Sequence, residues 1–131
     1  MKVEKDWTTA AGLRAVVIAA QMGHRCGYVG VPKDHPLFGK DYDDVGADVH
    51  GGLTFSSGET GKYPVESDLH WFGFDCSHYM DAKDTSIMSP EYLAIHEKYP
   101  RYDMEGAVVR DLAFCERECE SLAEQLCANL K

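Results

Sequence analysis

The hydrophobic positions in the first half of the chain follow the two-residue period of β-strands. Residues 12–20 are rich in β-branched side chains, and residues 25–31 form a second run that stops at a proline. Residues 21–24 lie between these runs as a turn, so the pair is predicted to form a β-hairpin. Two further strands are predicted over residues 48–56 and 69–76.

The second half of the chain changes to the period of an α-helix. One apolar stripe recurs at alternating spacings of four and three: Val108, Leu112, Cys115, Cys119, Leu122 and Leu126. It predicts a long C-terminal helix. Ser89 as an N-cap followed by Pro90 predicts a short helix that continues to Tyr99 and ends at Pro100.

Together these elements predict an α+β fold. We expect one domain over residues 1–131, with an antiparallel sheet of about four strands packed against the long C-terminal helix, plus the short helix. Alternation in strand 69–76 places Phe72, Phe74 and Cys76 on one face and Trp71 and Asp75 on the other.

Composition limits the classes of partner. The 13 Lys and Arg residues and 22 Asp and Glu residues leave a net charge of −9, which disfavours direct binding of nucleic acid because phosphate contacts depend on basic side chains. No apolar run reaches the roughly 18 residues of a membrane span, and no export signal is recognised at the N-terminus. Five cysteines, an odd number, favour reduced thiols in a cytoplasm over a disulfide framework.

Two cysteines lie four residues apart in the C-terminal stripe. Cys115 and Cys119 have a spacing that allows two ligands to one metal ion, but they stand between Leu112 and Leu122. A free cysteine in such a stripe behaves as a small hydrophobic residue, and buried packing is the favoured interpretation. Cys76, which shares a face with Phe72, is interpreted in the same way.

A polar cluster is the best candidate for a functional site. His50 precedes two glycines in a predicted strand, where glycine marks a bulge or a close backbone approach, while Asp75, His78 and Asp81 are spaced three apart. The predicted ligand-binding residues are His50, Gly51, Gly52, Trp71, Asp75, His78 and Asp81.

Within that set, two interpretations of the chemistry remain open. His50, Asp75, His78 and Asp81 suit a divalent metal ion, or an acid–base pair in which a carboxylate orients an imidazole. The alternative is local structure: Asp75 and Ser77 cap a turn, His78 is hydrogen-bonded to the backbone, and His50 is a hydrogen-bonded histidine in a β-bulge.

The irregular segment 32–46 has two open interpretations as well. It either covers a bound group with Phe38 and Tyr42 or packs those aromatic rings locally. The chain contains no P-loop, dinucleotide fingerprint, nucleophile elbow or HExxH motif, so the enzyme classes with readable motifs receive no support.

Several motifs resemble those of a group of small proteins encoded by bacteriophages and prophages, for which no activity is established. They are GHRCGYV at 23–29, HPL at 35–37, VHGGLTF at 49–55, WFGFDCSH at 71–78 and CESLAEQL at 119–126. The resemblance covers most of the chain after Gly23. It implies a bacterial cytoplasm and an accessory role such as interference with host defence.

The leading hypothesis is therefore a cytoplasmic accessory protein that binds a host protein or a small ligand. The alternative is a small metal-dependent hydrolase acting on a nucleotide-like substrate through His50, Asp75, His78 and Asp81. A third hypothesis is an assembly role, in which an uncovered part of the C-terminal stripe forms an oligomer interface.

Overall fold

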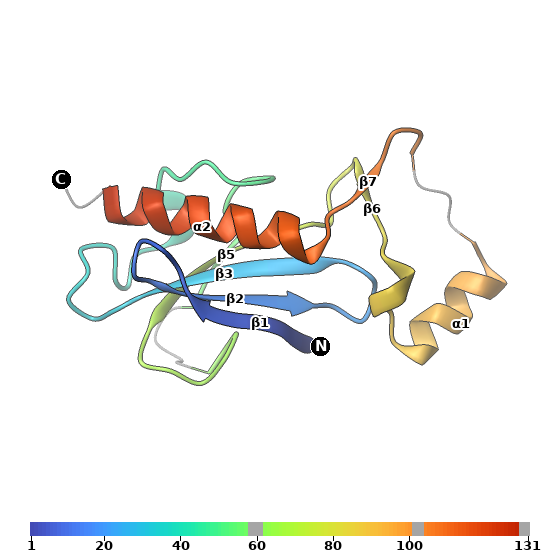
Figure 1. The fold of residues 1–131 in the computed structure, drawn as a ribbon, viewed down its shortest axis with the longest axis horizontal. Coiled ribbons are helices and arrows are strands. Elements are labelled where there is room, and N and C mark those ends of the chain that lie inside the picture. Colours follow the sequence, from blue (N-terminus) through green and yellow to red (C-terminus); the bar gives the residue numbers. More distant parts are fainter. Residues whose placement is uncertain (58–61, 101–103, 129–131) are drawn as a thin grey trace.

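The computed structural model describes residues 1–57, 62–100 and 104–128. A five-stranded antiparallel sheet carries one long helix across a single face (Figure 1). Its strands are β1 (Lys2–Thr8), β2 (Arg14–Ala19), β3 (Arg25–Val31), β4 (Phe55–Ser56) and β5 (His70–Asp75), in the order β1-β2-β3-β5-β4. The long helix is α2 (Leu112–Ala128), and the predicted α+β fold class is confirmed.

The remaining elements are short. They are the 3₁₀ turns η1 (Tyr42–Asp44) and η2 (Thr85–Ile87), the helix α1 (Pro90–Lys98), and a two-stranded parallel pair of β6 (Asp81–Ala82) and β7 (Val108–Val109). The short helix has the predicted N-cap, since the Ser89 hydroxyl accepts a hydrogen bond from the backbone N–H of Tyr92. No helix in the described ranges is long and apolar enough to cross a membrane.

The predicted hairpin is confirmed, and the position of β2 in the sheet explains why its apolar run is unbroken. β2 pairs with β3 in antiparallel register, for example Val16 with Tyr28. Ala15 and Val17 pack towards α2, while Val16 and Ile18 pack on the opposite face of the sheet. An interior strand that is covered on both faces needs apolar side chains at every position, which replaces alternation by a continuous run.

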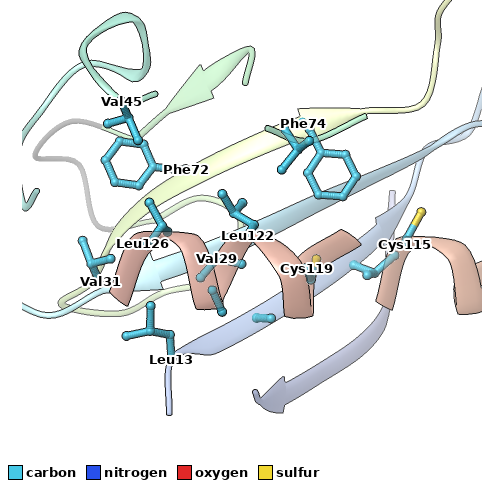
Figure 2. Packing of buried hydrophobic residues seen from close by; sticks show 14 of the residues in the cluster. Leu13, Val29, Val31, Val45, Phe72, Phe74, Cys115, Cys119, Leu122 and Leu126 are labelled. Carbon is cyan, nitrogen blue, oxygen red and sulfur yellow. The ribbon is translucent and has the colours of Figure 1, made fainter. Parts of the chain in front are cut away.

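The α2 stripe forms the main core against the sheet. Cys115, Cys119, Leu122 and Leu126 are fully buried and pack with strand residues such as Val29 and Phe72 (Figure 2). Burial of Cys115 and Cys119 confirms their interpretation as core residues, and the same holds for Cys76. The predicted stripe begins at Val108, but that residue instead lies exposed in β7.

The opposite face of the sheet has a cover of its own. Tyr63, Val65 and Leu69, which precede β5 in the chain, pack against a second buried cluster that includes Trp71 and Tyr28. The indole Nε1–H of Trp71 donates to the Ser67 hydroxyl at 2.9 Å. Both faces of the sheet are therefore occupied by the chain itself.

Two details of the sheet differ from the prediction. The sequence pattern does not predict β1, because its alternation is weakened by charged residues such as Lys5 and Asp6, which suit an exposed edge strand. The predicted strand 48–56 is wrong over most of its length, since only Phe55–Ser56 pair with β5. The glycines at 51 and 52, both with positive φ, turn the chain before β4 begins.

Between β5 and α2 the chain leaves the sheet. We call residues 77–111 the arm; its described residues, 77–100 and 104–111, contain β6, η2, α1 and β7 and lie beyond one end of the sheet (Figure 1). Helix α1 has no buried residue. The arm is therefore held by contacts at its base, and these contacts include most of the predicted site.

Candidate functional site

The Gly-Gly step forms a tight turn that presents His50. The Gly52 N–H donates to the Val49 carbonyl at 2.9 Å, and Gly51 at the third turn position has φ +69°. That combination is typical of a type II turn, whose third residue is usually glycine. The turn is fixed to α2 because the Glu118 carboxylate accepts the His50 backbone N–H at 2.8 Å.

Asp81 is the centre of the cluster. Its carboxylate is 1 % exposed and accepts hydrogen bonds from three donors: His50 Nε2–H at 2.9 and 3.0 Å, Arg110 Nε–H at 2.9 Å and the His78 backbone N–H at 3.0 Å. A buried carboxylate is stable only when such donors replace its water shell. Asp81 thus joins the Gly51 turn, the start of the arm and the residues just before α2.

These donors also determine the titration of Asp81. Burial by itself would raise the pKa of the carboxyl, but the hydrogen bonds from His50, Arg110 and the His78 backbone outweigh burial and lower the pKa below its ordinary value. The nitrogen of His50 that faces the carboxylate must carry a proton, so Nδ1 is the nitrogen left for any other contact.

A second aspartate–histidine pair lies next to the first. His78 Nε2 is 3.3 Å from Asp75 Oδ1, close enough for an ion pair but without an aligned hydrogen bond in the described structure. Asp75 accepts hydrogen bonds from the Thr54 hydroxyl and the Ser77 N–H, both at 3.1 Å. About half of its roughly four acceptor sites are therefore used within the chain.

Gly51 lies directly against the His78 ring. A Cβ at this position would overlap the imidazole, so the glycine is required both for its positive φ and for the close approach of the ring. Gly52, by contrast, has open space where a Cβ would stand and is required only for its φ of +80°.

Aromatic contacts complete the cluster on the α2 side. The His50 ring meets Phe114 edge-on at 5.1 Å between centroids and His78 at 5.6 Å. The Arg110 guanidinium lies over the Phe114 ring at 4.9 Å. His50 is consequently held on several sides by rings and charges of the chain itself.

His24 adds an imidazole at the same end of the sheet. Burial and the nearby Lys83 ammonium lower its pKa, although Asp75 opposes this shift, and its Nδ1 is buried without a hydrogen-bond partner among the described residues. The residues around the predicted cluster therefore include positive as well as negative charge.

A separate ion-pair cluster anchors the arm to strands β1 and β3. The nearly buried Arg25 guanidinium donates to Glu4 at 2.6 Å and to Asp84 at 2.9 Å, and it also reaches the Arg110 carbonyl at 3.3 Å. These contacts join β1 and β3 to η2 and to the end of the arm. The arm is thus tied to the sheet through two clusters of charged residues.

Most of the predicted site residues do come together. His50, Gly51, Asp75, His78 and Asp81 form one contiguous group, with Gly52 in the adjoining turn. Trp71 is separate from this group, because it is fully buried beneath the segment that carries Ser67.

The predicted metal set receives no support from this arrangement. Within residues 1–57, 62–100 and 104–128, no three His, Cys, Asp or Glu side chains are placed to hold a metal ion. The Ser77 N–H bond to Asp75 corresponds to the alternative interpretation, a turn cap, but the His78 ring nitrogen Nε2 makes no hydrogen bond among the described residues. The contact between Asp81 and His50 is a carboxylate–imidazole pair, as in the first interpretation.

Sequence reasoning missed three members of the cluster. Arg110, Phe114 and Glu118 come from the base of the arm and the first turns of α2, far from His50 in the chain. The spacing of four residues places Phe114 and Glu118 on one side of α2, while Arg110 precedes the helix. All three fall outside the apolar stripe, and only the packing of α2 on the sheet reveals their target.

The segment 32–46 packs on the core. Leu37, Phe38 and Tyr42 are partly buried against the main hydrophobic cluster, and the Phe38 ring lies 5.6 Å from the His70 ring. This arrangement agrees with local packing, the second of the two interpretations of the segment.

Comparisons of the chain with protein-family models, with curated proteins and with solved structures give no match.

Proposed function

We propose that this protein is a small accessory protein that binds a partner protein through the arm. The observation that carries the proposal is the exposure of large apolar side chains there. Tyr79, Ile95 and Tyr99 are 74 %, 57 % and 66 % exposed, and Tyr92, Met104, Val108 and Val109 are exposed as well. Clusters of exposed aromatic and aliphatic residues are typical of protein interaction sites.

The large exposed apolar residues of α1 and its C-cap lie on one side of the helix. Tyr92, Ile95 and Tyr99 are spaced by three and four, which aligns them in a single stripe. Leu93 and His96, on another side, are half-buried. A short helix with an exposed apolar stripe is suited to insertion into an apolar groove of a partner.

The charge of the molecule specifies the partner further. With a net charge of −9, the protein favours association with a basic surface, so we expect an apolar groove bordered by Lys and Arg. In this proposal the His50–Asp81–Arg110 cluster is a positioning device that fixes the base of the arm. The resemblance to phage and prophage proteins supports a bacterial host protein as the partner, with interference in host defence as the outcome.

A differential capture experiment tests the proposal. Wild-type protein, Ile95→Glu and Ala94→Glu are immobilised and exposed to the same bacterial lysate. Ala94 is also exposed on α1, so it receives the same new charge outside the apolar stripe. A host protein retained by the wild type and by Ala94→Glu, and lost with Ile95→Glu, is the expected result.

Other outcomes contradict the proposal. Equal retention on all three baits would place binding elsewhere on the molecule. A dimer in sedimentation analysis that dissociates with Ile95→Glu would assign the stripe to a second copy of the chain. A small molecule found by native mass spectrometry, with no protein selectively retained, would favour ligand capture instead.

The hydrolase alternative receives less support from the geometry. It requires His50, Asp75, His78 and Asp81 to converge on one ion, whereas Asp81 already accepts three donors and Asp75 accepts two. Titration with Zn²⁺ or Mn²⁺ followed by calorimetry would revive it if one ion bound stoichiometrically and His50→Ala abolished the binding.

A further inference from the structure

Two buried cysteines face each other at the base of the arm. The Sγ atoms of Cys76 and Cys115 are 3.7 Å apart, in van der Waals contact. Cys76 directly follows β5. Cys115, labelled in Figure 2, lies in the first turn of α2. Cys76 therefore marks the point where the chain leaves the sheet, and Cys115 the point where it enters α2.

We propose that Cys76 and Cys115 form a regulatory disulfide that closes residues 77–114 into a covalent loop. This inference goes beyond partner binding and does not depend on it, because it rests on the sulfur contact and its place in the fold. The two sulfurs already touch, so a bond of about 2.05 Å requires each to move by less than roughly 1 Å.

Cys119 and Cys127 are placed differently. Cys119 lies one helical turn further along α2, beneath Gly27 and Phe74. Cys127, near the end of the helix, contacts the Ala11 carbonyl with its thiol at 3.7 Å. Among the described residues, Cys76 and Cys115 are the pair whose thiols contact one another.

The chemistry needs an external oxidant, for which we name a small-molecule disulfide such as oxidised glutathione. One cysteine thiolate attacks the glutathione disulfide, forms a mixed disulfide and releases one glutathione thiolate. The second cysteine then attacks the mixed disulfide and releases the second. Two protein thiols are oxidised to one disulfide, one glutathione disulfide is reduced to two thiols, and the protons pass to the released thiolates.

Burial makes this exchange conditional on local opening. Contact with Cys115 and burial raise the pKa of the Cys76 thiol, so the reactive thiolate is scarce in the closed structure. The end turns of a helix open more readily than its centre, and opening of the first turn of α2 would expose Cys115. The bond should therefore form slowly in the native protein and faster at low denaturant concentration.

The bond would change the arm by tying its two ends together. A disulfide restricts the unfolded chain and stabilises the folded state more for longer loops. Residues 77–114 include His78, Asp81 and α1, so oxidation should raise the melting temperature and slow amide hydrogen exchange at the arm's base.

Peptide mapping identifies the bond in the wild-type protein. The full chain is incubated in a glutathione redox buffer, free thiols are alkylated, and trypsin is added without reductant. Cleavage after Lys62 and Lys83 releases the Cys76 peptide, and cleavage after Arg110 and Arg117 releases the Cys115 peptide apart from Cys119. We expect an intact mass lower by two hydrogen atoms and one cross-linked peptide joining 63–83 to 111–117.

Matched variants separate this pair from other thiols. Cys115→Ala should abolish the cross-link and the rise in melting temperature, while Cys119→Ala, equally buried one turn away, should retain both. No loss of mass at any buffer ratio, or a bond that joins a different pair, would overturn the proposal. The wild-type map decides the question even if a variant fails to fold.

Discussion

Gly51 and Gly52 are neighbours that experience different constraints. Both have positive φ, but only Gly51 lies against another side chain, the imidazole of His78. Alanine at Gly52 should cost about 1–2 kcal/mol through backbone strain alone. Alanine at Gly51 should cost at least about 1 kcal/mol more, because the new methyl group displaces the ring.

Urea denaturation of Gly51→Ala, Gly52→Ala and Gly51→Ala/His78→Ala measures these costs. In the double variant, the stability loss caused by displacement of the His78 ring should disappear, and the loss caused by backbone strain should remain. Equal stability losses for the two single alanine variants would show that the His78 ring is not packed against the turn.

Asp81 is expected to dominate the stability of the cluster. Asp81→Asn leaves the half-buried His50 and Arg110 without a full negative charge and should lower the free energy of unfolding by about 2–4 kcal/mol. Asp75→Asn is the matched control, because Asp75 is partly exposed and should cost about 1 kcal/mol or less. A smaller loss for Asp81→Asn than for Asp75→Asn in thermal or urea unfolding would refute the central role of Asp81.

The lowered pKa of Asp81 also gives a pH dependence. A carboxyl whose pKa is lower in the folded state stabilises the fold fully above its unfolded pKa of about 3.9, and this contribution disappears as pH falls through the folded pKa. The stability difference between wild type and Asp81→Asn should therefore be constant near neutral pH and shrink below about pH 4. Urea unfolding of both proteins across that pH range measures this difference. If the pKa of Asp81 were unchanged by folding, the two stabilities would not converge at low pH.

At this scale the sequence indicated which residues lie together, but not their partners. His50, the two glycines, Asp75, His78 and Asp81 stood out as polar or flexible positions beside predicted strands, and five of these six form the contiguous cluster. Arg110 and Glu118 could not be paired with them, since no local periodicity relates contacts that are 29 and 68 residues apart.

The two helices differ in what they contribute to the fold. α2 buries four fully enclosed stripe residues against the sheet, whereas α1 buries none. Leu122→Ala should therefore lower the free energy of unfolding by about 2–5 kcal/mol through cavity formation. Ile95→Ala should change it by no more than about 0.5 kcal/mol. A large loss for Ile95→Ala in chemical denaturation would show that α1 packs more tightly than its exposure indicates.

Predictability of the elements follows the strength of their local signals. The N-cap at Ser89 and the heptad-like stripe of α2 depend on short-range rules, and both predictions are confirmed. The predicted strand before β5 is too long because the alternation around Val49 and Leu53 continues through a turn that only the positive φ of the glycines reveals. β1 depends on pairing with β2, a tertiary contact.

On the scale of the whole molecule, many acidic side chains of α2 serve internal contacts. Glu116 pairs with Lys5 at 2.9 Å, Glu120 accepts the Ala10 N–H at 3.1 Å, and Glu118 accepts the His50 N–H. The sheet also covers the apolar stripe of α2. Its buried residues are therefore not available for the oligomer interface that the third hypothesis placed on this helix. The arm is therefore the better candidate for contact with another molecule.

Charge and apolar surface should affect partner binding in separable ways. The net charge of −9 acts over distances of about 8 Å in physiological salt, so the dissociation constant of the wild type should rise steadily as salt is added. Ile95→Glu removes apolar contact and should raise the dissociation constant at every salt concentration, whereas Ala94→Glu should follow the wild-type curve. Surface plasmon resonance with the captured partner measures these curves. A wild-type affinity independent of salt would argue against a basic partner, and coincident curves for wild type and Ile95→Glu would argue against the α1 stripe.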